Sequence, residues 1–286
     1  MAVAMTLVGV MAIASAAIFI RLSDASALAT AFYRLLFSTI LMSAWLVARH
    51  PKGALHIPWR YALPAGLALA AHFWLWMRSL DFTSVLVSTL FVTTTPVWLG
   101  LAAPILPSEP KLSRAGWMGL STALLGALLL AAADTTAAEI GARPLLGAFL
   151  ATAGAWAIAV YLTLSRRARQ TTALLPYSAA TTGIGAAALI IPMLATNAEF
   201  SGFPPETWLW FAALAFIPQL IGHNSLVWAV RYVGATTVAL IVLLEPLGSG
   251  ALAFLLFDER PTLLHGASSA VLIAGLAIVL RSRPER

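Results

Sequence analysis

The sequence predicts an all-α integral membrane protein with ten transmembrane helices, organised as two inverted five-helix repeats. Three observations predict this: the chain is strongly apolar, its apolar segments have membrane-spanning lengths, and its two halves align with each other. Of 286 residues, 60% are hydrophobic and 10% are charged, with a mean hydropathy of +0.90. Soluble domains carry about 25% charged residues, and one aqueous core cannot bury this much apolar surface. Lipid is therefore the expected solvent.

Ten segments reach the length of about 20 residues that an apolar helix needs to cross a bilayer core. In chain order they cover residues 3–22, 26–48, 60–79, 83–105, 113–132, 144–165, 174–195, 207–228, 235–256 and 261–280. The connectors are short, so neighbouring helices run antiparallel and no stretch is left for a soluble domain. Nine or eleven spans stay open as alternatives if one short segment is re-entrant. The first span lacks a basic leading region and is interpreted as retained rather than as a cleaved signal peptide.

Lys and Arg set the expected orientation, because the cytoplasmic loops of membrane proteins are enriched in them. With the N-terminus inside, the cytoplasmic side holds twelve of these residues and the outer side four, with Arg34 inside the second span. Both termini are thus predicted to be cytoplasmic, in a multi-pass protein of the cell (inner) membrane. The formal charge of +6 does not indicate nucleic-acid binding, because the basic residues lie in short connectors rather than on one soluble face.

A shift of 150 residues aligns the two halves without a gap and places "SLDFTSVLVSTLFVTTTP" on "AVRYVGATTVALIVLLEP". The landmarks that it superimposes are Pro96 with Pro246, Glu109 with Glu259, and Gly116 with Gly266. The repeats are then expected at 1–135 and 140–286, with five spans each. Because five is odd, the second half enters the membrane from the opposite side. Such inverted-topology repeats are characteristic of secondary transporters.

These features resemble the EamA-type drug/metabolite transporter superfamily. The resemblance covers essentially the whole chain and rests on two five-span halves with "…P…E.P" after the fourth span of each. The segment "FYRLLFST" at 32–39 is similar to the aromatic-Arg signature of that family. The stretch "HFWLWMRSLDFTSVLVSTLFVTTTPVW" most resembles the aromatic amino-acid exporter branch, YddG. This resemblance implies a ten-helix basket around a central cavity near the midplane, and export of amino acids or related metabolites. In one departure, the second half has no counterpart to Arg34.

Polar groups at membrane depth mark the candidate site, because each costs roughly 2.5–3.5 kcal/mol on insertion scales and so faces the interior or a wet cavity. Glu245 lies mid-span, where it can hold a substrate ammonium, carry a proton, or serve as a structural carboxylate. Its repeat mate is Thr95, so the halves present unlike groups at one depth, which suits a zwitterion. The candidate substrate-binding residues are His72, Trp76, Thr94, Thr95, Trp156, Gln219, His223, Asn224 and Glu245.

His72 and His223 fall in the repeat-related third and eighth spans. They can donate hydrogen bonds to a substrate carboxylate or make contacts between helices. Gln219 lies one turn before His223, on the same helical face. Trp76 and Trp156 are candidates for an aromatic wall that favours flat or apolar ligands, with simple space filling as the alternative. No metal or other cofactor is expected, because no third ligand joins the histidines and the chain has no cysteine.

Pro96 and Pro246 interrupt two spans and leave the carbonyl four residues earlier without its helical donor. In lipid that carbonyl must find another partner. The two prolines are therefore candidate hinges beside the site, with static kinks as the alternative. Arg34 lies deep in its span, and we expect it to make a structural pairing with Glu245 or with the freed carbonyls. Alternatively, Arg34 binds a substrate carboxylate.

The sequence thus predicts a secondary transporter that exports amino acids, aromatic or bulky neutral ones preferred, and related metabolites by alternating access. The alternative is efflux of multiple drugs, organic cations or polyamines, with Glu245 as the cation or proton site. Enzymatic activity is not expected, because the chain lacks GxxxxGK[ST], HExxH and GxSxG motifs. Small-residue faces in spans five and ten suit close helix packing and leave a homodimer and a monomer equally open.

Overall fold

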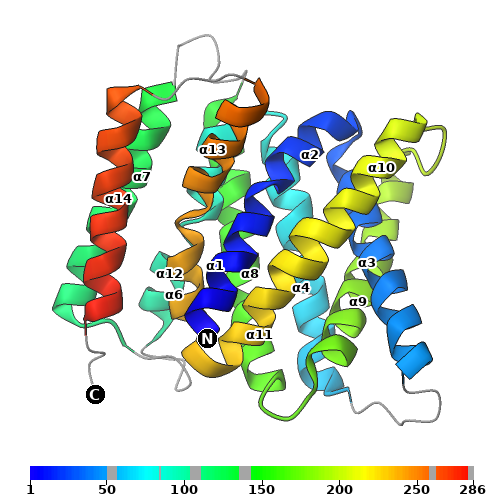
Figure 1. Cartoon of the computed structure of the whole chain (residues 1–286). Helices are drawn as coiled ribbons and strands as arrows, with labels where there is room; N and C mark the ends of the chain where they lie inside the picture. The colour runs from blue at the N-terminus through cyan, green and yellow to red at the C-terminus, as the bar shows by residue number, and fades with distance from the viewer. Residues whose placement is uncertain (50–56, 84, 104–110, 135–142, 258–261, 283–286) are drawn as a thin grey trace.

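The computed structural model describes residues 1–49, 57–83, 85–103, 111–134, 143–257 and 262–282 of the chain. The described segments contain no strand and form one bundle of helices (Figure 1). The landmarks Glu109 and Glu259 and the boundary between the two expected repeats lie outside the described residues.

The helices fall into two sets along the chain. The first set is α1 (Ala2–Ala14), α2 (Ala16–Ser23), α3 (Ala27–Arg49), α4 (Trp59–Ser79), α5 (Val85–Val92), α6 (Thr95–Ala102) and α7 (Arg114–Asp134). The second is α8 (Pro144–Ala168), α9 (Leu174–Ala195), α10 (Pro205–Leu214), the π-helical segment η2 (Ala215–His223), α11 (Asn224–Val233), α12 (Ala235–Val242), α13 (Glu245–Phe257) and α14 (Leu263–Arg281).

Several helices are long and apolar enough to cross a membrane. Within the described residues these are Ala2–Ser23, Ala27–Arg49, Leu145–Ala168, Leu174–Ala195 and Pro205–Val233, with shorter apolar helices at Ala235–Ser249 and Gly266–Arg281. The protein is therefore a helical membrane protein. The first span is divided at Ser15, a break that the sequence did not predict. The Ser15 hydroxyl donates to the Ala12 carbonyl at 2.7 Å, and the Ser249 hydroxyl of α13 donates to the Ala14 carbonyl at 3.1 Å.

The two proline-containing spans are broken at matching places. Helix α5 ends at Val92 and α6 begins at Thr95, while α12 ends at Val242 and α13 begins at Glu245. Each break lies 150 residues from the other, in the register found from the sequence. Both turns are tightened by bonds between residues three apart, from Thr94 N–H to the Phe91 carbonyl at 3.3 Å and from Leu244 N–H to the Ile241 carbonyl at 3.1 Å. Each break therefore presents helix ends to the interior.

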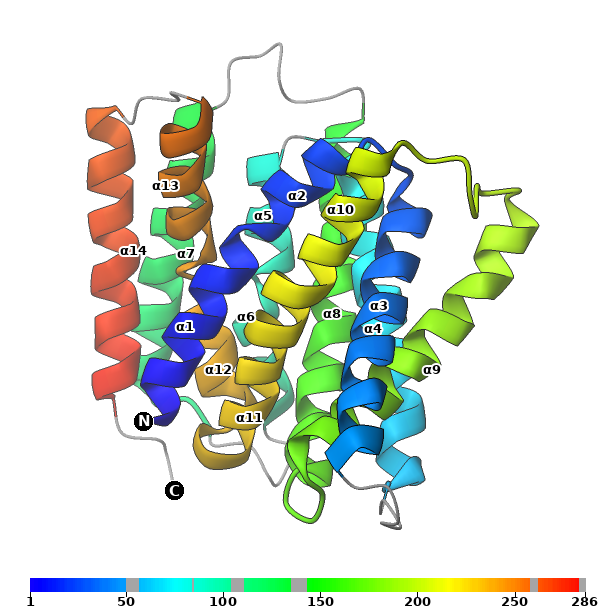
Figure 2. The same cartoon turned by 45° about the vertical axis from the view of Figure 1, so that its right-hand side comes forward.

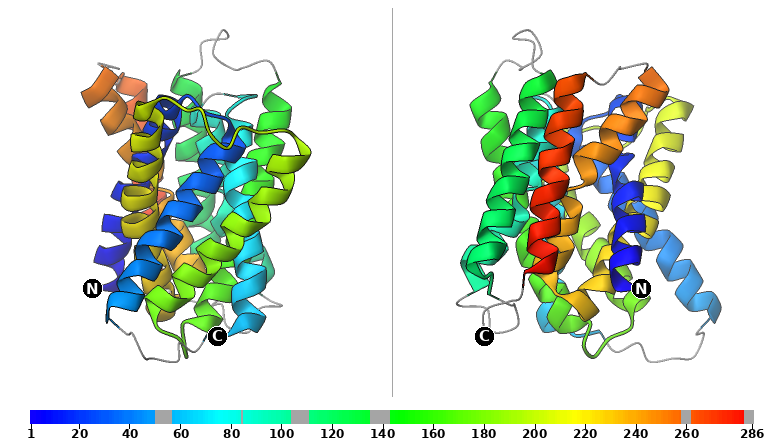
Figure 3. Two further views of the ribbon diagram at one scale, coloured as in Figure 1. Left: turned by 90° about the vertical axis from the view of Figure 1, so that its right-hand side faces the viewer. Right: turned by 60° about the vertical axis from the view of Figure 1, so that its left-hand side comes forward.

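Helix pairs far apart in the sequence pack side by side. Helix α3 contacts α9, α4 contacts α8 and α9, α1 contacts η2 and α11, and α7 contacts α14. The α7–α14 pair lies at one side of the bundle (Figure 1), and the right-hand view of Figure 3 shows the two helices next to each other from that side. Its backbones touch at glycines: a Cβ added at Gly275 would overlap the backbone of Ala123, and one at Gly126 would overlap that of Leu272. Small residues permit such close approach between helices in lipid.

Successive long helices run antiparallel. Helix α1 begins and α14 ends at the same end of the bundle (Figure 2). Helices α3, α8 and α11 also end there, and α4 and α7 begin there, so most of the chain's basic helix termini share this end.

Candidate functional site

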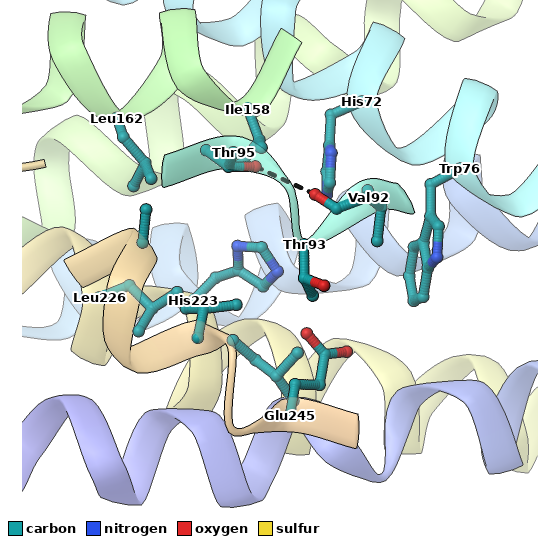
Figure 4. A pocket seen from close by; sticks show the side chains of 13 residues that line it. His72, Trp76, Val92, Thr93, Thr95, Ile158, Leu162, His223, Leu226 and Glu245 are labelled. Atoms are coloured by element: carbon teal, nitrogen blue, oxygen red, sulfur yellow. Dashed lines mark hydrogen bonds between the residues drawn. The ribbon is translucent and has the colours of Figure 1, made fainter. Parts of the chain in front are cut away.

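A cavity of about 50 Å³ lies where the two helix breaks face α4, α8 and α11 (Figure 4). Its polar lining consists of His72, Thr93, Thr95, His223 and Glu245, and Trp76 joins an otherwise apolar wall. The volume admits a few water molecules, whereas ligand pockets for drug-sized molecules measure about 300–1,000 Å³. The cavity is therefore narrower in this conformation than a drug-sized ligand requires.

Glu245 supplies the carboxylate of the cavity. It is the first residue of α13, because Pro246 cannot continue α12 by donating to the carbonyl of Val242. The residue is 5% exposed, and its carboxylate points toward the Thr93 hydroxyl and the His223 ring across the cavity (Figure 4). A buried carboxylate needs a compensating partner. Within the described part of the chain Glu245 makes no ion pair, so the cavity offers it to a cation.

His72 presents an acceptor to the cavity. Its Nδ1 lies 2.9 Å from the Gly154 carbonyl oxygen of α8, and a carbonyl only accepts, so Nδ1 carries the proton. In the neutral ring Nε2 is then an acceptor. In this neutral state His72 accepts a hydrogen bond from a ligand instead of donating one to a substrate carboxylate, because its donor is used by Gly154. The ring stacks on Trp76, with centroids 6.1 Å apart and planes at 13°.

The two nitrogens of His72 can be tested separately. The amide nitrogen of Asn reaches roughly the position of Nδ1, and the end of a Gln side chain reaches that of Nε2. We expect His72→Asn to keep the thermal unfolding midpoint close to wild type and to lower substrate flux about tenfold, because only the cavity acceptor is lost. His72→Gln should retain more flux and have a lower midpoint. Flux and midpoint that fall together in both variants would contradict this division.

The threonines before Pro96 hold the broken helix together. The Thr95 hydroxyl donates to the Val92 carbonyl at 3.0 Å, which is the carbonyl that the proline leaves without its helical donor (Figure 4). Thr93 donates to the Thr89 carbonyl at 2.9 Å. Thr94 lies outside the cavity lining: it donates to the Phe91 carbonyl at 2.6 Å and accepts from the indole Nε1 of Trp98 at 3.1 Å. These hydroxyl hydrogens are therefore committed to the protein.

Trp156 does not line the cavity, contrary to the expectation from the sequence. It is 45% exposed and meets Trp98 edge-on at 5.2 Å between centroids. The residues of α8 that face the cavity are Ile158 and Leu162. Positions two apart on an α-helix point in nearly opposite directions, so the rotation of α8 that turns Ile158 inward turns Trp156 outward.

Arg34, Gln219 and Asn224 also lie beyond the cavity lining. Arg34 Nε donates to Gln219 Oε1 at 3.1 Å, and the guanidinium lies 4.0 Å from the centroid of the Phe73 ring. In the described residues it makes no ion pair with Glu245, and the hydrogen bond that its side chain makes goes to Gln219. Asn224 instead contacts the Met42 sulfur at 3.4 Å.

The π-helical segment η2 was missed by the sequence analysis, which expected a continuous α-helix. Pro218 lies within η2 and has no amide hydrogen to donate to a helical turn. This proline is the feature of the sequence that could have predicted the irregular helix. The Ser38 hydroxyl of α3 reaches the Ala215 carbonyl, where η2 begins, at 3.1 Å. Such wide turns are frequent at functional sites, and this one positions both Gln219 and His223.

Helix α3 is fixed next to Arg34 by an aromatic cluster. Tyr33 stacks on Phe211 of α10 with centroids 4.9 Å apart and planes at 14°, and meets Trp208 edge-on at 4.9 Å. Its hydroxyl donates to the Phe200 carbonyl. These contacts hold α3 against α10, so that Arg34 faces η2.

Comparisons with known proteins agree with a membrane transporter. A family model described as the EamA-like transporter family matches residues 1–132 and 145–281. The "Uncharacterized transporter YdfC" of Bacillus subtilis (strain 168) is 24% identical over 192 residues, which cover 66% of this chain and 60% of that protein. This chain thus matches less than two thirds of the length of that relative. A solved crystal structure with 18% identity superimposes with a TM-score of 0.79, covering 97% of this chain and 96% of its own, and shows likeness of fold alone.

Proposed function

This chain belongs to the EamA-like transporter family, and from that premise we propose that it exports amino acids, preferring aromatic or bulky neutral ones, by alternating access. Membership of a transporter family implies a non-enzymatic role. The observation that carries the proposal is the narrow cavity at the two helix breaks, where the Glu245 carboxylate and the His72 acceptor share one space with Trp76. That combination suits a molecule with an ammonium group and an apolar side chain.

The electrostatics of the cavity favour an ammonium. Glu245 contributes a carboxylate without an ion-pair partner among the described residues, and Nε2 of the neutral His72 ring accepts a hydrogen bond. The remaining wall, with Trp76, Ile158, Leu162 and Leu226, is apolar. A large neutral side chain gains hydrophobic free energy by contacting it.

Transport then requires the cavity to open on each side in turn. We propose that the chain consists of two inverted repeats that rock against each other, as other secondary transporters with such repeats do. The matching breaks 150 residues apart and the antiparallel helix order support this proposal. We also propose that both termini are cytoplasmic, because basic residues cluster at the end of the bundle where α1 begins and α14 ends. At that end lie Arg49, Arg60, Lys111, Arg114, Arg166, Arg167, Arg169, Arg231 and Arg281, against Arg21, Arg78 and Arg143 at the other.

The proposal is tested with purified protein in liposomes loaded with labelled amino acids. We expect efflux of phenylalanine, tryptophan and leucine above protein-free liposomes, and weaker efflux of glutamate and lysine, whose side-chain charges meet an apolar wall. Imposing a pH gradient shows whether protons drive the flux. Flux of organic cations or polyamines without amino-acid flux would replace the proposal by cation efflux at Glu245.

The prolines at the breaks are proposed as hinges. Pro96 is buried and prevents a continuous helix through α5 and α6. We expect Pro96→Ala to lower the turnover rate severalfold while substrate affinity changes less than about twofold, because a restored helical bond stiffens the break without altering the cavity lining. Turnover comes from liposome efflux and affinity from ligand binding in detergent. Equal losses in turnover and affinity would contradict a hinge role.

A further inference from the structure

Buried side-chain nitrogens without hydrogen-bond partners gather near the Phe73 ring: those of Arg34 and Gln219 are donors, and Nδ1 of His223 donates in the tautomer that carries its proton there. Within the described residues, Nη1 and Nη2 of Arg34, Nε2 of Gln219 and Nδ1 of His223 are buried and have no hydrogen-bond partner. Arg34 is 0% exposed, Gln219 1% and His223 5%. A buried donor left without a partner costs about 1–3 kcal/mol, and more when it is charged. Several such donors close together indicate a site that an acceptor occupies during the working cycle.

The arrangement of the donors is fixed by contacts already made. Because Gln219 Oε1 accepts from Arg34 Nε at 3.1 Å, the amide nitrogen of Gln219 and the two terminal nitrogens of Arg34 are left to bind elsewhere. The Phe73 ring supports the guanidinium from 4.0 Å. It also packs edge-on against His223, with centroids 5.1 Å apart. Arg34 and His223 therefore touch one ring, and Gln219 is bonded to the first of them.

His223 connects this cluster to the substrate cavity. Its side chain lines the cavity, and its ring centroid lies 6.2 Å from that of His72. The cluster thus begins where the cavity ends. Arg34 and Glu245 form no ion pair in the described chain. The carboxylate of Glu245 lines the cavity, and Arg34 lies outside the cavity lining.

We propose that Arg34, Gln219 and His223 form a subsite for the carboxylate of the substrate, separate from the cavity groups that take its ammonium. Two parallel N–H donors of a guanidinium match the two oxygens of a carboxylate, and charge-assisted bonds of this kind are the strong ones. This inference rests on the proposed function and narrows it. The ligand must carry both charges, so amino acids bind at both ends and amines or polyamines at one end only.

The subsite also gives Gln219 a defined task. Its oxygen holds Arg34 in orientation, and its nitrogen adds a donor to the same acceptor. Changing Gln219 to Glu supplies a carboxylate from the protein itself, which pairs with Arg34 and repels a carboxylate from outside. The Gln219→Glu change keeps the side-chain shape and introduces the counter-charge that the buried guanidinium lacks. In this variant the carboxylate of the new Glu side chain therefore occupies the position proposed for the substrate carboxylate.

The test measures binding of three ligands that share one phenyl ring to the purified full-length protein in detergent. Phenylalanine carries both charges, phenethylamine only the ammonium, and 3-phenylpropionate only the carboxylate. We expect Gln219→Glu to weaken binding of phenylalanine and 3-phenylpropionate at least about tenfold, and to change that of phenethylamine less than about twofold. Gln170→Glu is the matched control, since the same amide-to-acid change falls on an exposed side chain that contacts the Arg166 and Arg231 carbonyls.

A second variant keeps the test decisive if Gln219→Glu folds poorly. Gln219→Met preserves length without adding charge and should weaken the two carboxylate ligands severalfold, again without affecting phenethylamine. Equal weakening of all three ligands, or no binding of 3-phenylpropionate to the wild type, would overturn the subsite. Absence of amino-acid flux together with intact charge-selective binding would instead remove the proposed export function and leave the subsite standing.

Discussion

Replacing Glu245 by Gln is expected to reduce amino-acid flux by about ten- to a hundredfold. The reason is the loss of a charge-assisted hydrogen bond to the substrate ammonium, which is worth about 1.5–3 kcal/mol, where each 1.4 kcal/mol is a factor of ten. Glu245 is 5% exposed and has no ion-pair partner in the described chain. Among the described residues it is also the acidic side chain of the cavity lining. Initial rates of labelled amino-acid efflux from liposomes measure the effect.

Stability is expected to move in the opposite direction. Glutamine has the shape of glutamate but does not require a charge to be removed from water, so the thermal unfolding midpoint of Glu245→Gln should equal or exceed that of the wild type. Glu206→Gln is the control, because Glu206 lies exposed in the first turn of α10, away from the cavity. Unchanged flux in Glu245→Gln would show that the carboxylate is not the ammonium partner. Flux that loses its dependence on a pH gradient would identify it as the proton site.

Replacing Gly275 by Leu is expected to lower the stability of the protein strongly, through the contact between α7 and α14. A Cβ at this position would overlap the backbone of Ala123 and lie 2.7 Å from the Gly119 carbonyl oxygen. Backbone atoms cannot turn aside as a side chain can, so α7 and α14 must separate. Overpacking commonly costs about 1–3 kcal/mol, occasionally more, and we expect a loss of about 3 kcal/mol or more at this contact.

The control for this change lies on the same helix. Gly266 of α14 has open space where a Cβ would go: apart from its own turn of helix, no heavy atom of the described residues lies within 4 Å. Gly266→Leu should therefore leave the thermal unfolding midpoint and the yield of folded protein in detergent near wild type, while Gly275→Leu reduces both. Equal behaviour of the two variants would mean that the α7–α14 contact does not contribute to stability.

Local patterns in the sequence predicted the position of several helices. The expected span 174–195 coincides with α9, and the expected span 26–48 with α3 (Ala27–Arg49), because hydropathy and length act residue by residue along the chain. The freed Val92 carbonyl, and the hydroxyl that satisfies it, followed from the chemistry of Pro96 and the neighbouring threonines. The sequence did not predict the break at Ser15 or the π-helical segment η2. Ser15 and Pro218 disfavour a regular helix only weakly, and contacts with other helices stabilise the irregular backbone there.

For the candidate site, too, some features followed from the sequence and others only from the packing of the helices. By itself the sequence determined that the chain belongs in lipid, where its helices lie, and that Glu245 is a buried charge beside a helix break. Each of these follows from transfer free energy or from the missing amide hydrogen of proline, and both act locally. Only the tertiary structure decided which side chains lie next to each other. Trp156 is exposed rather than facing the cavity. Arg34 donates to Gln219, and His72 donates to the Gly154 carbonyl. These outcomes depend on how each helix is rotated against neighbours distant in sequence, and one residue's rotation of about 100° exchanges an inner position for an outer one.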